Sequence, residues 1–410
     1  MIPRPTRSTG HRSSQSNSPS SSLTGAAVQQ QPTGAQRPTD IRNFPFTFEY
    51  TLHSAAPSVR IEADEHPSPS RKSWDDVSIT SSISAYRVEN GRTYHAYRDG
   101  SYPYPNDEME LARYEWMFVC LKHLFGGKNY FAPLSKHNPP SRILDIATGT
   151  GTWAIEMSDE FPNSEVYGTD LSPIQPSYVP ENVHFYIEDA LEDWVYPELL
   201  DYIHIRMALG VWQDFETDCA RKAFENLRPG GWFEAQELFP QVFCDDGTMP
   251  DNWPLKRLLE DLEECAELIG RSVRCAAVYK QALMNAGFVE VQQITFKIPI
   301  NSWPKNRKWK ELGDMWKGAF EGGGLQAMSM GLLHRVRGLK REQIEVRLLP
   351  MLLLRYSVFE SLTLEPSYIW WMSEERLLTG ACMRMKSKSG YAIVAVVCLL
   401  ISASLAAGPD

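Results

Sequence analysis

The chain has 410 residues, a formal net charge of −10 at pH 7 and a predicted pI near 5.5, and 43% of its residues are hydrophobic. This length suits one large α/β domain with tails or two average domains, and the acidic balance argues against direct binding of nucleic acid through phosphate contacts. The seven cysteines form no CxxC pair, so we expect reduced thiols in an intracellular protein, cytoplasmic or nuclear, without a metal site.

The first 88 residues are expected to be disordered. Residues 1–40 are mostly Ser, Thr, Pro, Gly and Gln, with no apolar run and no secretory signal pattern. A stretch of this composition buries too little apolar surface to offset the entropy cost of ordering it. Order is expected to begin near "NGRTYHAYRDGSYPYPND", residues 90–107, where aromatic residues stand between turn signals.

A helix is expected over residues 107–125. Apolar residues recur there at a spacing close to 3.6, which indicates one buried face. Asp107 suits the N-cap position, and Gly126 and Gly127 follow where the helix should stop.

From residue 142 onward, strand and helix patterns alternate. Short apolar runs predict strands over residues 142–147, 165–170, 183–189, 200–208, 230–238 and 288–300. Helical patterns lie between them, over residues 152–161, 215–226, 255–270 and 276–286. This alternation predicts an α/β fold, a Rossmann-like, doubly wound and mostly parallel sheet with flanking helices.

The last part of the chain changes in texture. Residues 299–345 predict two or three helices over the sheet edge and would end a domain spanning residues 89–345. Residues 346–410 form an atypical tail. Within it, residues 391–407 carry no charge and follow three basic residues, the pattern of a tail anchor in a membrane. A buried core strand or helix is disfavoured there because the run shows no amphipathic face.

A glycine-rich turn follows the first predicted strand, in "ILDIATGTGTW". Gly149 and Gly151 would let a nucleotide lie close to the backbone where the next helix begins. Together with Ala154 they also satisfy the NAD pattern GxGxx(G/A), so that cofactor stays open. Asp145 favours a different cofactor, because a carboxylate there would repel a pyrophosphate. S-adenosylmethionine carries an ammonium and a sulfonium and has no phosphate.

Acidic residues also follow the next two predicted strands. Asp170 ends the second and can accept both ribose hydroxyls, which NAD and S-adenosylmethionine share. Asp189 follows the third, where its carboxylate can bind the adenine amine while the Ala190 backbone lies beside the ring. Glu188 is an alternative for the role of Asp189.

These motifs resemble a known family. "ILDIATGTGTW", "VYGTDLSP", "IEDALEDW" and "LRPGGWFEAQE" occur in the order of class I S-adenosylmethionine-dependent methyltransferases. "GRTYHAYRDGSYPYPNDEMELAR", "IHIRMALGVWQDF" and "WPKNRKWKELG" resemble the fungal LaeA-like methyltransferases more narrowly, and the resemblance covers about residues 90–345. It implies a Rossmann-like sheet, S-adenosylmethionine as methyl donor and a role in or near secondary metabolism.

The resemblance also implies roles for single residues. Asp145, Gly149 and Gly151 would form the cofactor loop, Asp170 would bind the ribose and Asp189 the adenine.

Two features depart from the family pattern. Ala147 stands where the family usually has Gly, and its methyl could crowd the methionine tail of the cofactor. The usual last strand, reading like "VYVVYGRKP", is not recognisable, and the resemblance ends near residue 346. Either a gene-model error such as a retained intron or a real divergent tail would explain this.

Other residues have both structural and functional interpretations. His204 and Arg206 share one face of the fourth predicted strand, and His204 is the nearest candidate for a general base. The N-terminal tyrosines either pack a cap onto the sheet or cover the cofactor: Tyr94, Tyr97 and Tyr102. Structural roles are favoured for Glu234, Glu237, Trp303, Trp309 and Trp316.

Two classes of function remain open on the sequence. One is an active methyltransferase acting on a small molecule or a protein. The other is a regulatory protein that keeps the fold and works through a protein partner. Ala147 and the unrecognised last strand favour the second, whereas the ordered acidic and glycine positions favour the first.

Overall fold

The computed structural model of the protein describes residue 83 and residues 85–244, 249–352 and 393–404. Most of the expected disordered region and most of the tail therefore lie outside the described residues. Structure begins slightly before the expected boundary, because β1 (Arg87–Glu89) pairs antiparallel with β2 (Arg92–Tyr94). Asn90 and Gly91 form the turn, both with positive φ, as a tight hairpin requires.

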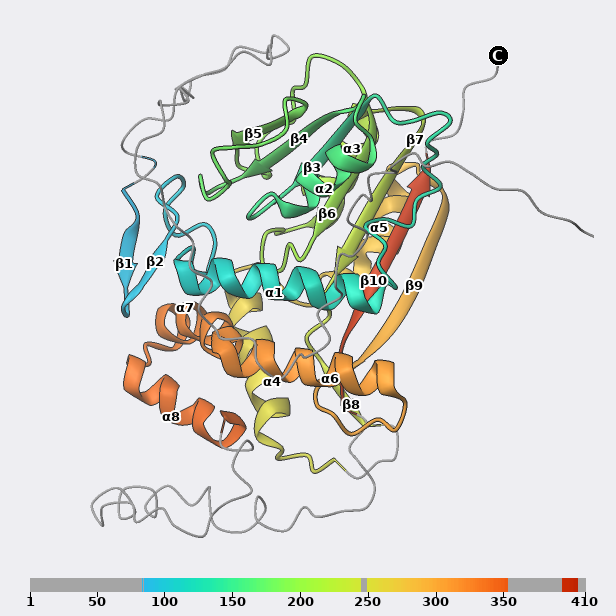
Figure 1. The fold of residues 1–410 in the computed structure, drawn as a ribbon. Helices are drawn as coiled ribbons and strands as arrows, with labels where there is room; N and C mark the ends of the chain where they lie inside the picture. The colour runs from blue at the N-terminus through green and yellow to red at the C-terminus, as the bar shows by residue number, and fades with distance from the viewer. Residues whose placement is uncertain (1–82, 84, 245–248, 353–392, 405–410) are drawn as a thin grey trace, which may run out of the picture. The chain divides into compact units, whose positions relative to one another are not determined.

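The centre of the fold is a sheet of eight described strands (Figure 1). They are β3 (Arg142–Ile146), β4 (Glu165–Asp170), β5 (Val183–Ile187), β6 (Leu200–Arg206), β7 (Leu227–Glu237), β8 (Val242–Cys244), β9 (Val289–Pro299) and β10 (Ile393–Ser404). The order is β5-β4-β3-β6-β7-β10-β8, with β9 also paired to β10. β3 to β7 are parallel, whereas β10 is antiparallel to its neighbours. The predicted α/β fold and all six predicted strands are confirmed.

The last strand of the sheet corrects two expectations about the tail. The structure places a strand, and not a membrane helix, over the described part of residues 391–407. β10 lies between β7 and β9, with Leu399 opposite Glu237 on one side and Thr295 on the other. β10 therefore takes the position of the family's antiparallel last strand, which was not recognisable in the sequence.

The sequence of β10 explains why its role was missed. A strand with a neighbour on each side, in a sheet covered by helices, can be a continuous apolar run, so alternation does not reveal it. Within the ranges that the structure describes, no helix is both long and apolar enough to cross a bilayer.

The described helices match the predicted ones closely. They are α1 (Glu108–Leu124), α2 (Thr152–Glu160), α3 (Arg221–Asn226), α4 (Pro254–Leu268), α5 (Ala276–Ala286), α6 (Arg307–Ala319), α7 (Leu325–Arg337) and α8 (Arg341–Leu352). Asp107 caps α1 by accepting a hydrogen bond from the Glu110 backbone. The helix predicted over residues 215–226 begins with a π-helical turn, η2 (Glu216–Ala220), and a second such turn, η3 (Phe320–Gly324), joins α6 to α7.

Different helices cover the two faces of the sheet. In β3, Leu144 joins the core that includes α5, whereas Ile143 joins the core that includes α2. In β6, Tyr202 also belongs to the α2 core. Because side chains alternate along a strand, Asp145 and His204 lie on the α2 face of the sheet.

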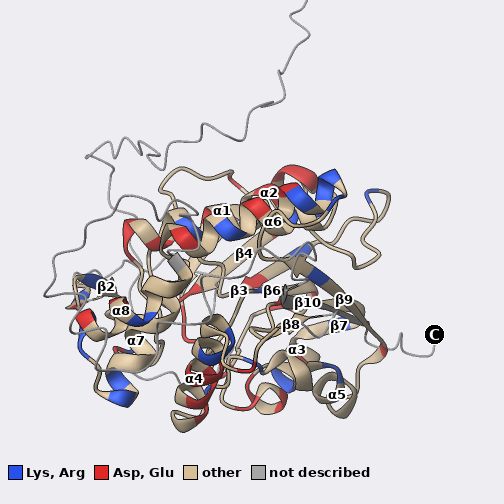
Figure 2. Cartoon of the chain, turned by 90° about the horizontal axis from the view of Figure 1, so that it is seen from below, with Lys and Arg blue, Asp and Glu red and all other residues tan. Residues whose placement is uncertain are grey.

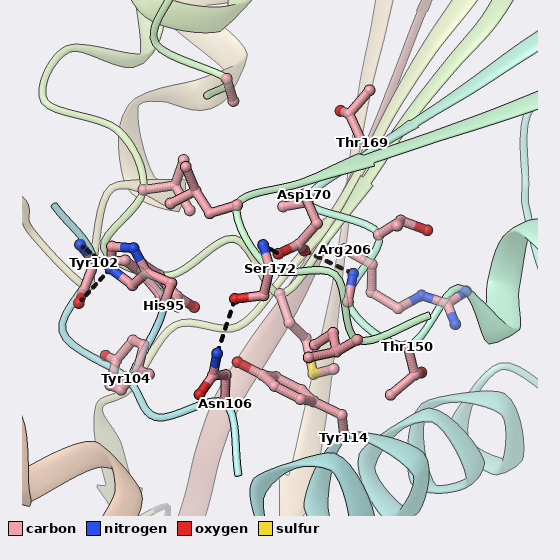
Figure 3. Close-up of a pocket in the computed structure, with 18 of the residues that line it drawn as sticks. His95, Tyr102, Tyr104, Asn106, Tyr114, Thr150, Thr169, Asp170, Ser172 and Arg206 are labelled. Carbon is pink, nitrogen blue, oxygen red and sulfur yellow. Dashed lines mark hydrogen bonds between the residues drawn. The ribbon is translucent and has the colours of Figure 1, made fainter. Parts of the chain in front are cut away.

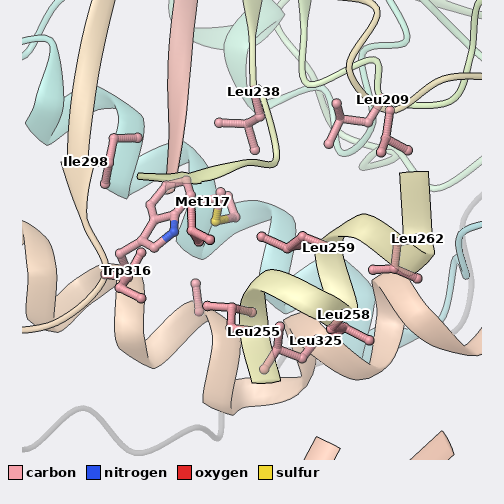
Figure 4. Packing of buried hydrophobic residues seen from close by; sticks show 14 of the residues in the cluster. Met117, Leu209, Leu238, Leu255, Leu258, Leu259, Leu262, Ile298, Trp316 and Leu325 are labelled. Carbon is pink, nitrogen blue, oxygen red and sulfur yellow. The ribbon is translucent and has the colours of Figure 1, made fainter. Parts of the chain in front are cut away.

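A third core lies among α1, α4, α6, α7 and α8 (Figure 4). Five of the 15 residues of α4 are acidic, and basic residues of α7 and α8 lie beside it (Figure 2). Arg337 pairs with Glu264 at 2.6 Å, and Arg347 pairs with Asp261 at 3.3 Å. Helices were expected within residues 299–345, and α6, α7 and the start of α8 lie there. α8 continues to Leu352.

Candidate functional site

A cavity opens at the carboxyl ends of β3, β4, β5 and β6 (Figure 3), the edge at which open α/β sheets bind ligands. Six predicted site residues line it: Asp145, Ala147, Gly149, Asp170, Asp189 and Ala190. Two predicted residues, Gly151 and His204, are not among the lining residues. The cavity therefore gathers most of the candidate site, although its members lie far apart in the sequence.

A row of buried polar side chains crosses the α2 face of the sheet beneath the cavity. Asp145 in β3, His204 in β6 and Glu234 in β7 are direct cross-strand partners, each at most 2% exposed. His204 Nδ1 lies 2.7 Å from Asp145 Oδ1, and the Thr148 hydroxyl donates to Asp145 Oδ2 over 2.6 Å. The register of the strands thus fixes the carboxylate of Asp145 at the floor of the cavity.

The His204 ring supports Asp145 and does not face the cavity. It is fully buried and stacks on Trp153, with ring centroids 3.7 Å apart and planes at 5°. Burial lowers the pKa of His204 and outweighs the opposing effect of the Asp145 carboxylate, so the neutral ring donates from Nδ1. This position does not suit the predicted role of general base, because the ring has no surface in the cavity.

Asp170 shapes the glycine loop as well as lining the cavity. Its Oδ2 accepts a hydrogen bond from the Gly149 backbone over 2.9 Å, and its Oδ1 accepts one from Ser172 over 3.0 Å. Burial raises the pKa of Asp170 to about 6, the charge of Asp145 adds to the rise, and the backbone hydrogen bonds oppose it. The carboxylate is therefore ionised at pH 7 and becomes protonated as the pH falls below about 6.

Gly151 has a packing role. Its φ is +77°, and a Cβ added there would lie 2.3 Å from Cζ of the Phe185 ring. Glycine at this position lets the start of α2 approach β5, which the sequence pattern had attributed to close contact with a cofactor.

Ala147 adopts a backbone conformation that favours glycine, with φ at +55°. A non-glycine residue in the left-handed region costs about 1–2 kcal/mol. We expect Ala147→Gly to raise the free energy of unfolding by about 0.5–1 kcal/mol, because relief of this strain exceeds the added entropy of the unfolded chain. Urea denaturation measures it. Ala154→Gly, in the buried face of α2, should instead destabilise the protein, and a destabilised Ala147→Gly would contradict the strain argument.

The turn after β5 holds the third predicted group. Asp189 Oδ1 accepts a hydrogen bond from the Leu191 backbone over 3.0 Å, so the carboxylate orders this turn. The Ala190 carbonyl accepts from the Trp194 indole over 2.9 Å. Glu188, the alternative to Asp189, also lines the cavity and accepts from the Tyr196 hydroxyl over 3.3 Å. Both acids remain beside the space predicted for adenine.

The segment before α1 forms a wall of the cavity that the sequence only partly indicated. His95, Tyr102, Tyr104 and Asn106 line it (Figure 3). The Asn106 amide donates to the Ser172 hydroxyl over 3.2 Å and ties this segment to the end of β4. Of Tyr94, Tyr97 and Tyr102, only Tyr102 lines the cavity. Tyr94 is buried, and the guanidinium of Arg335 lies 4.6 Å from the centre of its ring.

Arg206 and the two glutamates of β7 form hydrogen bonds that fix the loops and turns next to the cavity. Arg206 lines the cavity, and its guanidinium donates to Gln236 Oε1 over 2.7 Å and to the Asn129 carbonyl over 3.0 Å. Glu234 accepts from the backbone of the loop before β3, as the structural interpretation expected. Glu237 accepts from the Ala208 backbone over 2.9 Å and so fixes the turn after β6.

Glu237 should make stability depend on pH. Burial raises its pKa from 4.5 to about 8, despite hydrogen bonds from Ala208, Leu238 and Tyr279 that oppose the shift. Between these two values the folded state binds this proton more tightly than the unfolded state. The free energy of unfolding should therefore fall as the pH rises, by at most about 1.4 kcal/mol per pH unit.

The measurement is urea denaturation between pH 5 and 8. Glu237→Gln should flatten the profile relative to the native protein, because the amide cannot ionise. Identical pH profiles for the two proteins would contradict the raised pKa.

The donor set of the cavity suits S-adenosylmethionine better than NAD. The carboxylates of Asp145, Asp170 and Asp189 all belong to the lining, and Asp145 lies under the glycine loop where NAD would place its pyrophosphate. Carboxylates match ribose hydroxyls and an ammonium group, whereas they repel phosphates.

Comparisons with known proteins agree with this chemistry. The family described as "Methyltransferase domain" matches residues 121–293. The chain is 37% identical over 298 residues to methyltransferase pytC of Aspergillus terreus. The matched residues cover 72% of this chain and 91% of that protein. It is 35% identical over 256 residues to the secondary metabolism regulator LAE1 of Cochliobolus heterostrophus, covering 61% and 82%. It is 28% identical over 325 residues to the protein-methionine methyltransferase laeA of Emericella nidulans, covering 77% and 85%.

Proposed function

The chain belongs to the LaeA-like family of S-adenosylmethionine-dependent methyltransferases, and from that premise we propose that it methylates a small organic acceptor in or near fungal secondary metabolism. One observation carries the proposal: three neighbouring parallel strands bring Asp145, Asp170 and Asp189 to a single cavity. We assign Asp145 to the ammonium of the amino-acid tail, Asp170 to the ribose hydroxyls and Asp189, with the Ala190 backbone, to the adenine.

Methyl transfer needs positioning more than covalent catalysis by the protein. When bound, S-adenosylmethionine supplies an activated methyl group, whose bond to sulfur breaks as the acceptor's lone pair forms the new bond and sulfur keeps the electrons. The chain aligns the acceptor and excludes water. Burial raises the pKa values of Tyr102, Tyr104 and Tyr114, so their hydroxyls keep their protons and can donate hydrogen bonds to an acceptor.

A protein acceptor or a regulatory partner is the second candidate. The relative from Emericella nidulans is named a protein-methionine methyltransferase, and LAE1 is named a regulator. We place the protein inside the cell, in the cytoplasm or nucleus, where either acceptor would be available.

Calorimetry and a transfer assay test the proposal. Full-length protein should bind S-adenosylmethionine and not NAD, and the opposite selectivity would overturn the cofactor assignment. With methyl-labelled donor and a fungal extract, label should appear in the small-molecule fraction. Label in the protein fraction alone would favour the second candidate, and binding without any transfer would favour a regulatory role.

A further inference from the structure

A second cavity adjoins the first and is lined mainly by apolar side chains. Its walls come from α1, α4, α6, η3 and α7, and the side chains include Met117, Leu259, Trp316, Phe320 and Met328. Figure 4 shows the indole of Trp316 among Met117 and the leucines of α4. This space lies within the third core and not on the surface of the sheet.

Four residues line both cavities and so mark where they meet. Tyr102, Tyr104 and Tyr114 place three phenol rings there, and Met207 is the fourth. Met207 has φ at +53°, an uncommon conformation for a residue other than glycine. Strained backbone of this kind concentrates at functional sites, which agrees with the position of Met207 between the two spaces.

Two buried polar atoms of the second cavity have no hydrogen-bond partner among the described residues. They are the hydroxyl of Tyr104 and Nε1 of Trp316. Tyr104 is 5% exposed and Trp316 is 2% exposed, so bulk water does not satisfy them. Buried polar groups are rarely left unpaired in folded proteins, and each such exception calls for a partner. An oxygen acceptor on a bound molecule would supply one.

The charged and titratable side chains that line the second cavity limit which chemical classes of methyl acceptor could react there. Arg113 lines it, paired with Glu110 over 2.5 Å and with its guanidinium 4.8 Å from the centre of the Tyr114 ring. None of the described lining residues carries a carboxylate or an imidazole. Because burial keeps the tyrosines protonated, no lining group can readily take a proton from an acceptor. An acceptor that depends on the second cavity alone therefore has to ionise by itself.

We propose that the second cavity binds the methyl acceptor as a small planar enol or phenol that enters as its anion. The ring would pack beside Trp316 and Phe320, and the oxygen would face the phenol hydroxyls at the junction, near Arg113. An anionic oxygen becomes a neutral ether on methylation, so no side chain has to accept a proton. This inference rests on the proposed function, because it assigns the first cavity to the methyl donor.

The probe for this inference is 4-nitrophenol, whose absorbance reports its ionisation. With full-length protein saturated with S-adenosylhomocysteine, it should bind saturably, and its apparent pKa should fall because the site prefers the anion. The uncharged ether 4-nitroanisole should bind at least tenfold more weakly. Equal binding of the two ligands would overturn the preference for an anion.

Variants locate the bound probe. Tyr104→Phe and Trp316→Phe each remove one unpartnered polar atom and should weaken 4-nitrophenol about fivefold, the value of one ordinary hydrogen bond. Ala319→Leu fills the second cavity alone and should abolish probe binding while leaving S-adenosylmethionine affinity within twofold. Matched controls are Tyr97→Phe, which lines neither cavity, and Asp314→Ala, at an exposed position of α6.

Each outcome bears on one proposal. If S-adenosylmethionine binds but 4-nitrophenol does not, or if the variants bind the probe like the native protein, the second cavity is not the acceptor site. If S-adenosylmethionine does not bind, the proposed function fails whatever the probe does. If Ala319→Leu loses its thermal transition, the two phenylalanine variants decide the location.

Discussion

Replacement of Glu234 by alanine is expected to lower the free energy of unfolding by about 3 kcal/mol or more. The side chain is fully buried, and its oxygens accept hydrogen bonds from the backbone of Phe131 and Ala132 and from the Gln236 amide, at 2.7–2.9 Å. Truncation removes an acceptor from all three donors, and only the Gln236 amide keeps another partner, the Asn129 carbonyl. It also removes the end of the polar row that begins at Asp145.

The measurement is urea denaturation at pH 7, followed by both fluorescence and circular dichroism. Glu234→Gln is the conservative comparison, because it keeps the size and one acceptor oxygen, and it should lose roughly half as much. A loss below about 1 kcal/mol for Glu234→Ala would mean that water or the loop replaces the lost hydrogen bonds.

Replacement of Asp170 by alanine is expected to weaken S-adenosylmethionine binding by about 10- to 100-fold, or roughly 1–3 kcal/mol. Two effects combine. The carboxylate is assigned to the ribose hydroxyls, and it also holds the Gly149 and Ser172 backbone groups that shape the loop. Calorimetry on the full-length protein measures it, with Asp159→Ala, an exposed acid of α2, as the matched control. Unchanged affinity would place the ribose elsewhere.

The affinity should also depend on pH through Asp170. The pKa of this carboxyl is raised to about 6, so the anion is present above that pH and is lost as the pH falls through it. Native protein should therefore bind the cofactor with constant affinity from pH 7 to 8 and more weakly at pH 5. Asp170→Asn should show weaker binding without this slope, because the amide does not titrate. The same slope in both proteins would assign the titration to another group.

The local sequence was enough to predict β3, β4 and β6 and the acids that end or follow the parallel strands. Short apolar runs bounded by turn residues have few alternatives, and the carboxyl ends of neighbouring parallel strands always meet at one edge. Asp145, Asp170 and Asp189 could therefore be placed at one site without knowledge of any contact between them.

His204 and Gly151 show where that reasoning stops. The alternation of side chains along a strand predicted that His204 and Arg206 share one face of β6. It could not predict that His204 stacks on Trp153 or lies opposite Asp145, because burial and strand register depend on which strands pair. The motif assigned Gly151 to the cofactor loop. Its packing against the ring of Phe185 could not be predicted from that motif, because Phe185 lies far along the chain.

By itself, the sequence determined the fold class, the order of the parallel strands along the chain and the acidic edge of the site, since these follow from period and composition. Only the tertiary structure decided that Ile393–Ser404 completes the sheet, that Asp145, His204 and Glu234 form one row, and that a second cavity adjoins the first. The physical reason is common to all three. Each depends on contacts between segments far apart in the sequence. The local sequence of an apolar run or a buried polar residue does not show which segment it will pack against.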